Sequence, residues 1–170
     1  MTSPHRRLFL ALWPDEGIRG QLAAHASKWA WSPGCARYQP ADWHVTLHFI
    51  GTVDAERVTN VSSHAAVPFQ PFELVLDQPR LWPHGLAVLC AAKVPPPLLA
   101  LYDRLGHALR GLDLPVETRP YRPHVTLARH AETATPPTAS APVRWQVRSF
   151  ALIVSTGNKD TRYQVIRQYR

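Results

Sequence analysis

Short apolar runs and amphipathic stretches alternate along the chain, separated by proline, glycine and acidic residues. The apolar run 7–13 stops at a proline and predicts a buried strand. Residues 14–31 begin with Pro-Asp-Glu, which is typical of a first helical turn, and predict a helix that ends near Trp31. Alternating apolar and polar positions over 43–50 predict a second strand, which Gly51 closes.

The rest of the chain continues this mixture of helices and strands. Its patterns predict helices at 54–66 and 95–111, and strands at 72–82, 86–94, 123–129, 143–156 and 162–169. Residues 131–142 are rich in Ala, Thr and Pro, and predict a surface loop. We therefore expect an α+β protein with mainly antiparallel sheets and with helices on the outside.

The short sequence His-Val-Thr-Leu occurs twice, at His44–Leu47 and at His124–Leu127. A His-apolar-Thr-apolar pattern is expected by chance well below once in a chain of this composition. Each copy lies in a predicted strand that follows a predicted helix. The two halves of the chain therefore resemble each other loosely, as duplicated lobes would.

Strand geometry gives the repeated motif a meaning, because residues i and i+2 of a strand point to the same face. His44 and Thr46 share one face, while Val45 and Leu47 point the other way, into a core. The second motif repeats this arrangement. Two such strands, placed side by side, form a cleft with two imidazoles and two hydroxyls. By the same parity, His48 is predicted on the face of His44.

Two imidazoles and two hydroxyls on one surface suit the cleavage of a phosphoester. Free imidazole titrates near ~6.5, so a neutral histidine can accept a proton from attacking water while a protonated one donates to the leaving oxygen. Threonine hydroxyls can stabilise the negative charge that develops on the phosphate oxygens. We predict His44, His124, Thr46 and Thr126 as catalytic residues, and we expect no metal and no cofactor.

Three further side chains are candidate substrate-binding residues. Arg122 has the parity of His124, so it can face either the phosphate or the solvent. Arg129 breaks this parity and needs a bulge or a strand end to reach the cleft. Tyr121 precedes the second motif and can either stack on a base or pack inside the protein.

Other interpretations stay open at this point. Each motif can be a half-buried polar pair on a strand, although two identical copies argue against this. The histidines can bind zinc with His48 as a third ligand, but zinc sites normally add a carboxylate or thiolate, and the motif flanks offer only Asp42. An RNA-binding module without turnover is a further alternative. So is an enzyme acting on small cyclic nucleotides or ADP-ribose cyclic phosphate.

Composition narrows the class of partner. The chain has 170 residues, a net charge of +7 and a pI near 10.0, which favours polyanions such as nucleic acid. Cys35 and Cys90 do not form a disulfide framework and fit a reducing cytosol. No signal peptide and no run of ~20 apolar residues is recognisable. We expect a cytoplasmic monomer that does not bind a membrane.

The paired motifs resemble those of the two-histidine phosphoesterase superfamily. Within it, the chain is most similar to the bacterial and archaeal RNA 2',3'-cyclic phosphodiesterases, also called 2'-5' RNA ligases. The similarity covers nearly the whole chain and includes the segments 7–12, 44–51, 123–129, 145–155 and 163–166.

This resemblance implies two βα lobes related by a pseudo-twofold axis, with one motif from each lobe in a central cleft. We therefore expect one domain, residues 1–170, formed by two intertwined lobes. The resemblance implies hydrolysis of a 2',3'-cyclic phosphate at an RNA end to a 2'-phosphate. It assigns His44 as the proton donor and His124 as the proton acceptor. It also implies that 2'-5' linkages can be joined or cleaved.

Overall fold

Most strands of the protein belong to one large antiparallel sheet. The structure, a computed structural model, describes residues 4–170. Its strands are β1 (His5–Leu12), β2 (Ala36–Arg37), β3 (Val45–Asp54), β4 (Phe72–Leu76), β5 (Gln78–Trp82), β6 (Leu86–Cys90), β7 (His124–Arg129), β8 (Val143–Val147), β9 (Phe150–Ser155) and β10 (Tyr163–Tyr169). The eight-stranded sheet has the order β10-β9-β1-β3-β7-β6-β5, with β2 also paired to β7, and β4 and β8 form a second sheet.

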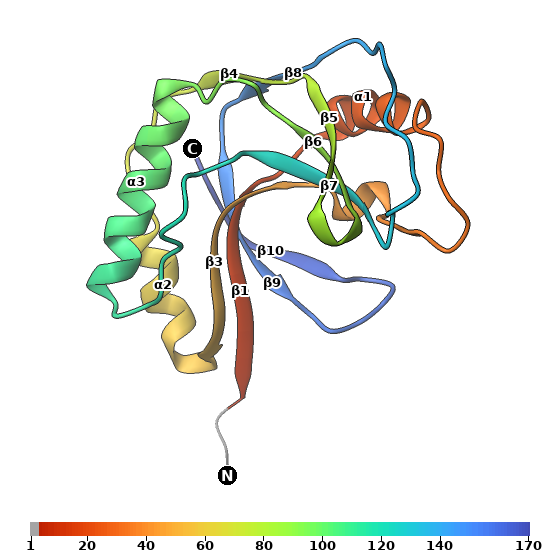
Figure 1. The fold of residues 1–170 in the computed structure, drawn as a ribbon. Coiled ribbons are helices and arrows are strands. Elements are labelled where there is room, and N and C mark those ends of the chain that lie inside the picture. Colours follow the sequence, from red (N-terminus) through yellow and green to blue (C-terminus); the bar gives the residue numbers. More distant parts are fainter. Residues whose placement is uncertain (1–3) are drawn as a thin grey trace.

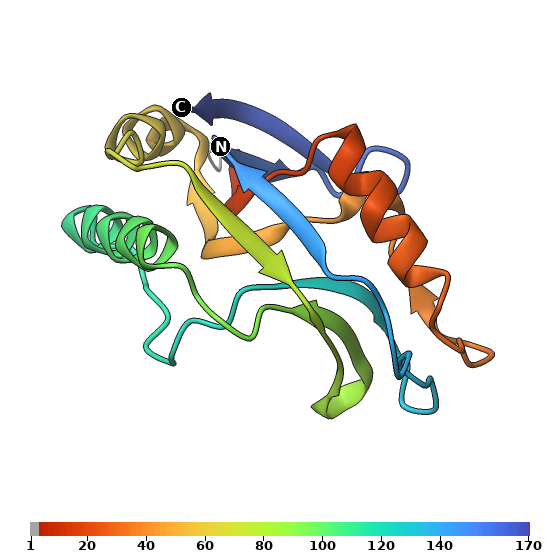
Figure 2. The same ribbon diagram turned by 90° about the horizontal axis from the view of Figure 1, so that it is seen from above.

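The α-helices of residues 4–170 pack against the main core that one face of the sheet forms. They are α1 (Glu16–Ala26), α2 (Val58–His64) and α3 (Pro96–Gly111), and short 3₁₀ turns occur at Pro40–Asp42, Ala55–Arg57 and Pro83–Gly85. Helices α2 and α3 lie side by side at one end of this core, and α1 lies at the other end (Figures 1 and 2). In the described part of the chain, no helix is long and apolar enough to cross a membrane.

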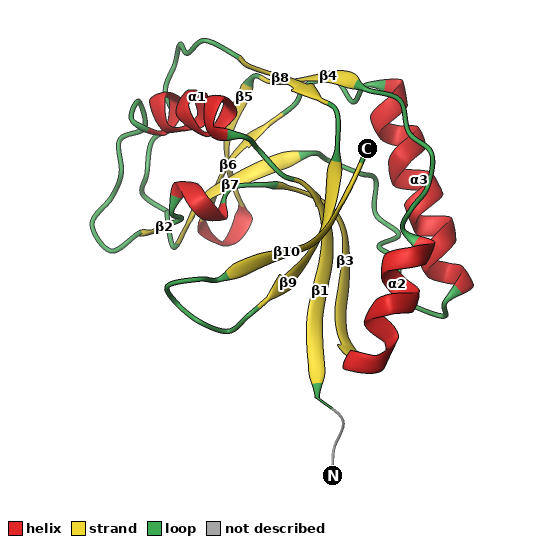
Figure 3. Cartoon of the chain, turned by 180° about the vertical axis from the view of Figure 1, so that it is seen from behind, coloured by secondary structure: helices red, strands yellow, loops and turns green. Residues whose placement is uncertain are grey.

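The order of elements repeats along the chain. The series β1-α1-β3-β4-β5 corresponds to β6-α3-β7-β8-β9, and the two motif strands β3 and β7 are neighbours in the centre of the sheet. Beyond them, β9 pairs with β1 while β5 pairs with β6, so each half contributes its outer strand to the other half. The predicted α+β fold with two pseudo-symmetric lobes is confirmed, as Figure 3 shows from behind.

Both faces of the second half of β1 are buried, which explains its nearly continuous apolar pattern. Its three leucines point into the main core between the sheet and the helices. The opposite face carries a smaller apolar cluster, formed by Phe9, Ala11, Ala151 and Ile153, with Trp13 and Tyr163 packed against it. This smaller cluster supports the face of the sheet on which the histidines of the motifs lie.

Several predicted boundaries are wrong. The strand predicted over 86–94 ends at Cys90, and the helix predicted over 54–66 is α-helical only at Val58–His64. Helix α1 ends at Ala26, and the helix predicted to continue to Trp31 stops there, because the indole of Trp31 folds back and donates to the Ala26 carbonyl at 3.0 Å. Strand β3 continues beyond Gly51 to Asp54. Gly51 has φ +87°, a value that glycine adopts without strain, and it sits at a register shift opposite β1, so it bends the strand without ending it.

Two predicted strands are each divided in the structure. The segment 72–82 forms β4 and β5, and the segment 143–156 forms β8 and β9. In both cases the first part belongs to the two-stranded sheet and the second part to the large sheet. The predicted loop 131–142 contains buried Ala131 and Ala134, and Thr135 forms a bridge to Ala30. Part of that loop is therefore fixed against the residues that follow α1.

Candidate active site

The two central strands bring the repeated motifs together. Val45 of β3 pairs with Val125 of β7 in antiparallel register. Continuing this register places His44 opposite Thr126, and Thr46 opposite His124. A cavity of about 110 Å³, the catalytic cavity, is lined by all four predicted catalytic side chains, together with Tyr38, Phe49, Arg129 and Tyr163.

The backbone holds both imidazoles in the same way. Nδ1 of His44 lies 2.8 Å from the Asp42 carbonyl, and Nδ1 of His124 lies 2.7 Å from the Arg122 carbonyl. A carbonyl oxygen can only accept a hydrogen bond, so Nδ1 carries a proton in each ring. Proton exchange therefore falls to Nε2, which in His44 lies 3.1 Å from the Thr46 hydroxyl oxygen.

Aromatic rings surround the two histidines unequally. The ring centroid of His44 lies 4.9 Å from Phe9, 5.8 Å from Trp13 and 5.5 Å from Tyr163. His124 contacts Trp82, with centroids 4.5 Å apart. His44 is consequently the more enclosed of the pair.

Burial lowers the pKa of both imidazoles. The pKa of His44 is lowered to about 4, mainly by desolvation; the hydrogen bond to the Asp42 carbonyl raises it, and the positive charges of His124 and Arg19 contribute to the lowering. Desolvation also lowers the pKa of His124, opposed by its bond to the Arg122 carbonyl and assisted by the Arg122 charge. Both buried rings are therefore neutral at pH 7, and the free-imidazole value does not apply. A bound phosphate anion raises both pKa values.

The first motif contains a β-bulge that changes which side chains face the cavity. Ala11 of β1 pairs with Thr46 and Leu10 pairs with His48, which leaves Leu47 as an extra residue. The extra residue reverses the alternation of the strand. The prediction that His48 shares the face of His44 is therefore wrong, and the next residue, Phe49, lines the cavity instead.

The second motif has a bulge at the same position. Residues 87–88 of β6 pair with Ala128 and Thr126, which leaves Leu127 as the extra residue. This bulge brings Arg129 to the catalytic cavity at the end of β7. Arg129 thus reaches the cleft through a bulge near the end of its strand, as its odd position relative to His124 required. It occupies the place in the second motif that Phe49 occupies in the first.

His48 lies outside the catalytic cavity, but it lines a neighbouring cavity that His124 also lines. It is 3% exposed, its Nε2 lies 2.8 Å from the Tyr102 carbonyl, and its ring stacks on Tyr102 with centroids 4.2 Å apart. These contacts attach β3 to α3. Within residues 4–170, no group of three or more His, Cys, Asp or Glu side chains is arranged to hold a metal ion.

A larger cavity of about 600 Å³ adjoins the catalytic one and shares Thr46, Phe49 and His124 with it. Two of the predicted substrate-binding residues lie here. Arg122 is exposed, with its guanidinium 4.3 Å from the centre of the Trp82 ring. The hydroxyl of Tyr121 donates to the Thr46 carbonyl at 2.9 Å, and its ring stacks on Tyr102. Tyr121 therefore forms part of the wall and fixes the first motif strand.

Several residues of the site were not among the predicted site residues. Tyr38, which follows β2, and Tyr163, which begins β10, line the catalytic cavity, and Trp82 contacts His124 from β5. Phe49 stands two residues after the end of the first motif, at a position that only the bulge turns toward the cavity. The parity of the strand could have identified it if the bulge had been known.

The fold and the paired His-x-Thr strands together define a two-histidine phosphoesterase. The chain belongs to the 2'-5' RNA ligase superfamily, whose family model matches residues 18–159.

Individual relatives agree with this assignment. The chain is 32% identical over 174 residues to the RNA 2',3'-cyclic phosphodiesterase of Escherichia coli strain K12, covering 99% of this chain and 98% of the relative. The crystal structure of E. coli LigT complexed with 3'-AMP superposes with a TM-score of 0.87 at 27% identity, covering 98% of each chain. The crystal structure of TT0787 of Thermus thermophilus gives a TM-score of 0.77 at 25% identity, covering 96% of each chain.

Proposed function

We propose that this protein hydrolyses 2',3'-cyclic phosphodiester ends of RNA to 2'-phosphomonoesters by acid–base catalysis with two histidines. One observation carries the proposal: antiparallel pairing at Val45 and Val125 places both motif histidines and both motif threonines around one small cavity. The similarity to the E. coli RNA 2',3'-cyclic phosphodiesterase supports the choice of substrate. The aromatic rings around His44 and the backbone bonds to both imidazoles pre-organise the site.

In the proposed reaction, Nε2 of His124 accepts a proton from the attacking water, whose oxygen forms a new bond to phosphorus. The bond between phosphorus and the 3' oxygen breaks. Nε2 of His44 donates its proton to that oxygen, which leaves as a hydroxyl. The product carries the phosphate on the 2' oxygen, and the two histidines end with exchanged protonation states. Proton exchange with solvent then restores them.

The remaining residues of the catalytic cavity fit a phosphate anion. The hydroxyls of Thr46 and Thr126 can donate to non-bridging oxygens as their charge increases. Arg129 lines the same cavity and supplies a permanent positive charge. The anion also favours the protonated form of His44 that the acid step needs, because its charge raises the pKa that burial lowers.

The larger cavity fits the nucleoside of the RNA end. Trp82 and Phe49 offer aromatic faces beside His124, and Arg122 covers one face of Trp82. We assign Arg122 to this part of the substrate. Tyr121 supports the same cavity from behind through its bond to the Thr46 carbonyl.

The same site can join RNA ends. If the 5'-hydroxyl of a second RNA replaces water as the nucleophile, the 3' oxygen still leaves with the proton of His44. The phosphate then bridges the 2' oxygen and the incoming 5' oxygen, which is a 2'-5' linkage. Hydrolysis and ligation therefore share the acid and the base, and the nucleophile decides between them. We also propose that the protein acts in the cytoplasm as a monomer.

The deciding experiment incubates the purified protein, in the presence of EDTA, with an oligoribonucleotide that ends in a 2',3'-cyclic phosphate. We expect the cyclic phosphate to disappear and a 2'-phosphate to form. The same oligonucleotide with a 3'-hydroxyl end serves as the control. Tight binding without any conversion would replace the proposed enzyme with a non-catalytic RNA-binding protein. Conversion of a nucleoside cyclic phosphate, but not of the oligonucleotide, would indicate a small-nucleotide substrate.

A further inference from the structure

We infer that a further cavity, between α1 and the segment before β3, binds the nucleotide that precedes the reacting end of the RNA. It is distinct from the catalytic cavity and from the larger cavity beside it, and is named the second cavity. The inference rests on the proposed function, because it extends the substrate beyond its last nucleotide. The cavity has a volume of about 300 Å³ and is lined by Ala23, Ala26, Arg37, Tyr38, Gln39, Pro40 and Trp43. That volume is at the lower end of the range for small-ligand sites, ~300–1,000 Å³.

Strand β2 connects this second cavity to the catalytic one. It pairs with β7 directly after the second motif, with Ala36 opposite Arg129 and Arg37 opposite Ala128. Tyr38 follows, and its backbone N–H donates to the Leu127 carbonyl at 2.8 Å. The position of β2 is therefore set by the motif strand itself.

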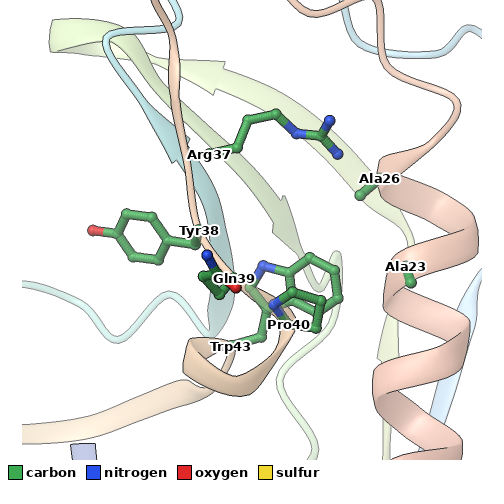
Figure 4. Close-up of a pocket in the computed structure, with 7 residues that line it drawn as sticks. All are labelled: Ala23, Ala26, Arg37, Tyr38, Gln39, Pro40 and Trp43. Atoms are coloured by element: carbon green, nitrogen blue, oxygen red, sulfur yellow. The ribbon is translucent and has the colours of Figure 1, made fainter. Parts of the chain in front are cut away.

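Tyr38 separates the two cavities and lines both of them. In Figure 4 the Arg37 side chain reaches toward Ala26 of α1, while the Tyr38 ring points away from α1. A chain that leaves the catalytic cavity past Tyr38 therefore arrives next at the guanidinium of Arg37. Two consecutive nucleotides are neighbours of this kind.

Arginine side chains stacked on aromatic rings mark the surface between the cavities. The guanidinium carbons of Arg129 and Arg162 lie 5.7 Å and 5.8 Å from the centre of the Tyr38 ring. That of Arg37 lies 4.8 Å from the centre of the Trp31 ring. Stacked guanidinium groups lose little freedom when they bind a phosphate or a base, and they pair with phosphate in fixed geometry.

These arginines are available for an anion. Within residues 4–170, Arg37 and Arg129 form no ion pair, and Arg162 has one long contact of 3.8 Å with Asp42. A row of positive charge that leads away from a catalytic cavity fits a polyanion better than a small neutral molecule.

The walls of the second cavity fit a base. Ala23, Ala26 and Pro40 are apolar, and the Gln39 amide can both donate and accept hydrogen bonds. The indole N–H of Trp43 is buried and has no hydrogen-bond partner in residues 4–170. An unpaired buried donor of this kind is destabilising. Arginine, aromatic and amide groups together are the chemistry that recognises a nucleotide of a single strand.

The test compares a short and a long substrate on the intact protein. The short one is adenosine 2',3'-cyclic phosphate, which fills only the catalytic cavity and the larger cavity beside it. The long one is a triadenylate with the same cyclic end. For Arg37→Ala we expect KM for the trinucleotide to rise roughly 5-fold or more, because one stacking or phosphate contact is lost. The kinetics of the mononucleotide should stay unchanged. Arg104→Ala, an exposed arginine on α3, is the matched control and should change neither.

Two further measurements sharpen the comparison. The dependence of trinucleotide binding on salt should weaken by about one charge in Arg37→Ala. Arg37→Lys keeps the charge but loses the planar guanidinium that stacks. It should therefore show the salt dependence of the wild type, and a KM between those of the wild type and of Arg37→Ala. Equal effects of Arg37→Ala on both substrates, or no effect on either, would overturn the second subsite.

The subsite and the proposed reaction can fail separately. Binding of the triadenylate and of adenosine, each ending in a 2'-phosphate, measures the subsite without turnover. If the wild-type protein hydrolyses neither substrate, the proposed function is wrong, and a selective loss of trinucleotide affinity in Arg37→Ala still supports the subsite. If hydrolysis occurs but the variant binds both ligands like wild type, the subsite is wrong and the reaction stands.

Discussion

Val45 and Val125 face each other as the one registered pair between β3 and β7 in residues 4–170. On their other edges β3 pairs with β1 and β7 pairs with β6, and these pairings include Val45 and Val125 themselves. On the edge that faces β3, β7 pairs with β2 after the motif. The two central strands therefore pair with each other only at the start of the motifs, in the described part of the chain. The catalytic cavity is lined from both strands around this junction. The pairing of these two apolar residues thus brings the two imidazoles to one cavity.

The first prediction concerns the motif histidines. His44→Ala and His124→Ala should each lower kcat by roughly 10²–10⁴-fold, because each removes one positioned proton-transfer group. The measurement is steady-state hydrolysis of a cyclic-phosphate oligonucleotide. His107→Ala changes an exposed histidine on α3 and is the matched control. Retention of more than about a tenth of the activity by either motif variant would remove that histidine from its role, since general catalysis contributes at least ~10²-fold.

The motif threonines should matter less than the histidines. Thr46→Val and Thr126→Val keep the shape of the side chain and remove a donor to the phosphate, so we expect roughly 10–10³-fold lower kcat. In Thr46→Val, the contact with Nε2 of His44 is also lost. A change in KM alone, with kcat intact, would show that the hydroxyls bind the ground state and give no extra stabilisation to the transition state.

Activity should persist in excess EDTA. The two imidazoles can supply both acid and base, and both are already held by backbone carbonyls through Nδ1. The measurement is the hydrolysis rate before and after chelation followed by gel filtration. Loss of activity with EDTA, restored by zinc or manganese, would favour the metal mechanism instead.

The hydroxyl of Tyr121 should contribute to stability through its bond to the Thr46 carbonyl. Tyr121→Phe keeps the stacked ring, so we expect the free energy of unfolding to fall by about 0.5–1.5 kcal/mol. Chemical denaturation measures this. Tyr102→Phe is the matched control, because Tyr102 belongs to the same stack and its hydroxyl has no hydrogen bond in residues 4–170. Equal losses in both variants would mean that the Thr46 bond contributes nothing specific.

Patterning predicted most elements and the four motif residues, because these depend on local periodicity. The apolar run of β1, the amphipathic α3 and the alternation in both motifs are properties of a few consecutive residues. The meeting of the two motifs in one cleft came from the resemblance to the family, because periodicity does not determine which strands become neighbours. Local periodicity does not show where pairing with a neighbouring strand adds an extra residue and interrupts the alternation.

The bulges at Leu47 and Leu127 are such interruptions. Each depends on how the motif strand pairs with its neighbour, β1 or β6, and neither is written in the motif itself. They reverse the parity of the residues that directly follow each bulge, which is why the prediction for His48 is wrong while Arg129 reaches the cavity. Tyr38 and Tyr163 come from other parts of the sheet, so only the tertiary fold brings them to the site.

The last prediction concerns pH. The mechanism needs one imidazole protonated and the other neutral. In the free protein the pKa of His44 is about 4, and the pKa of His124 lies below the ordinary value of 6.5. Below both pKa values the base is lost, and above both the acid is lost. The plot of kcat/KM, which reports free-protein groups, should therefore rise and then fall, with its maximum on the acid side of pH 6.5.

The bound substrate should displace this profile. A phosphodiester places a negative charge beside both rings, and an opposite charge favours their protonated forms. The plot of kcat, which reports the complex, should therefore be bell-shaped and lie at higher pH than that of kcat/KM. Initial rates at saturating and at limiting nucleoside cyclic phosphate, over a pH series that spans both limbs, measure the two plots separately.

Phosphorus NMR of the product should show a 2'-phosphate at every pH, because His44 donates to the 3' oxygen. A profile that lacks one limb would remove one histidine from its role, and a kcat/KM maximum on the alkaline side would contradict the effect of burial. A 3'-phosphate would keep the histidine pair and overturn the position of the donor.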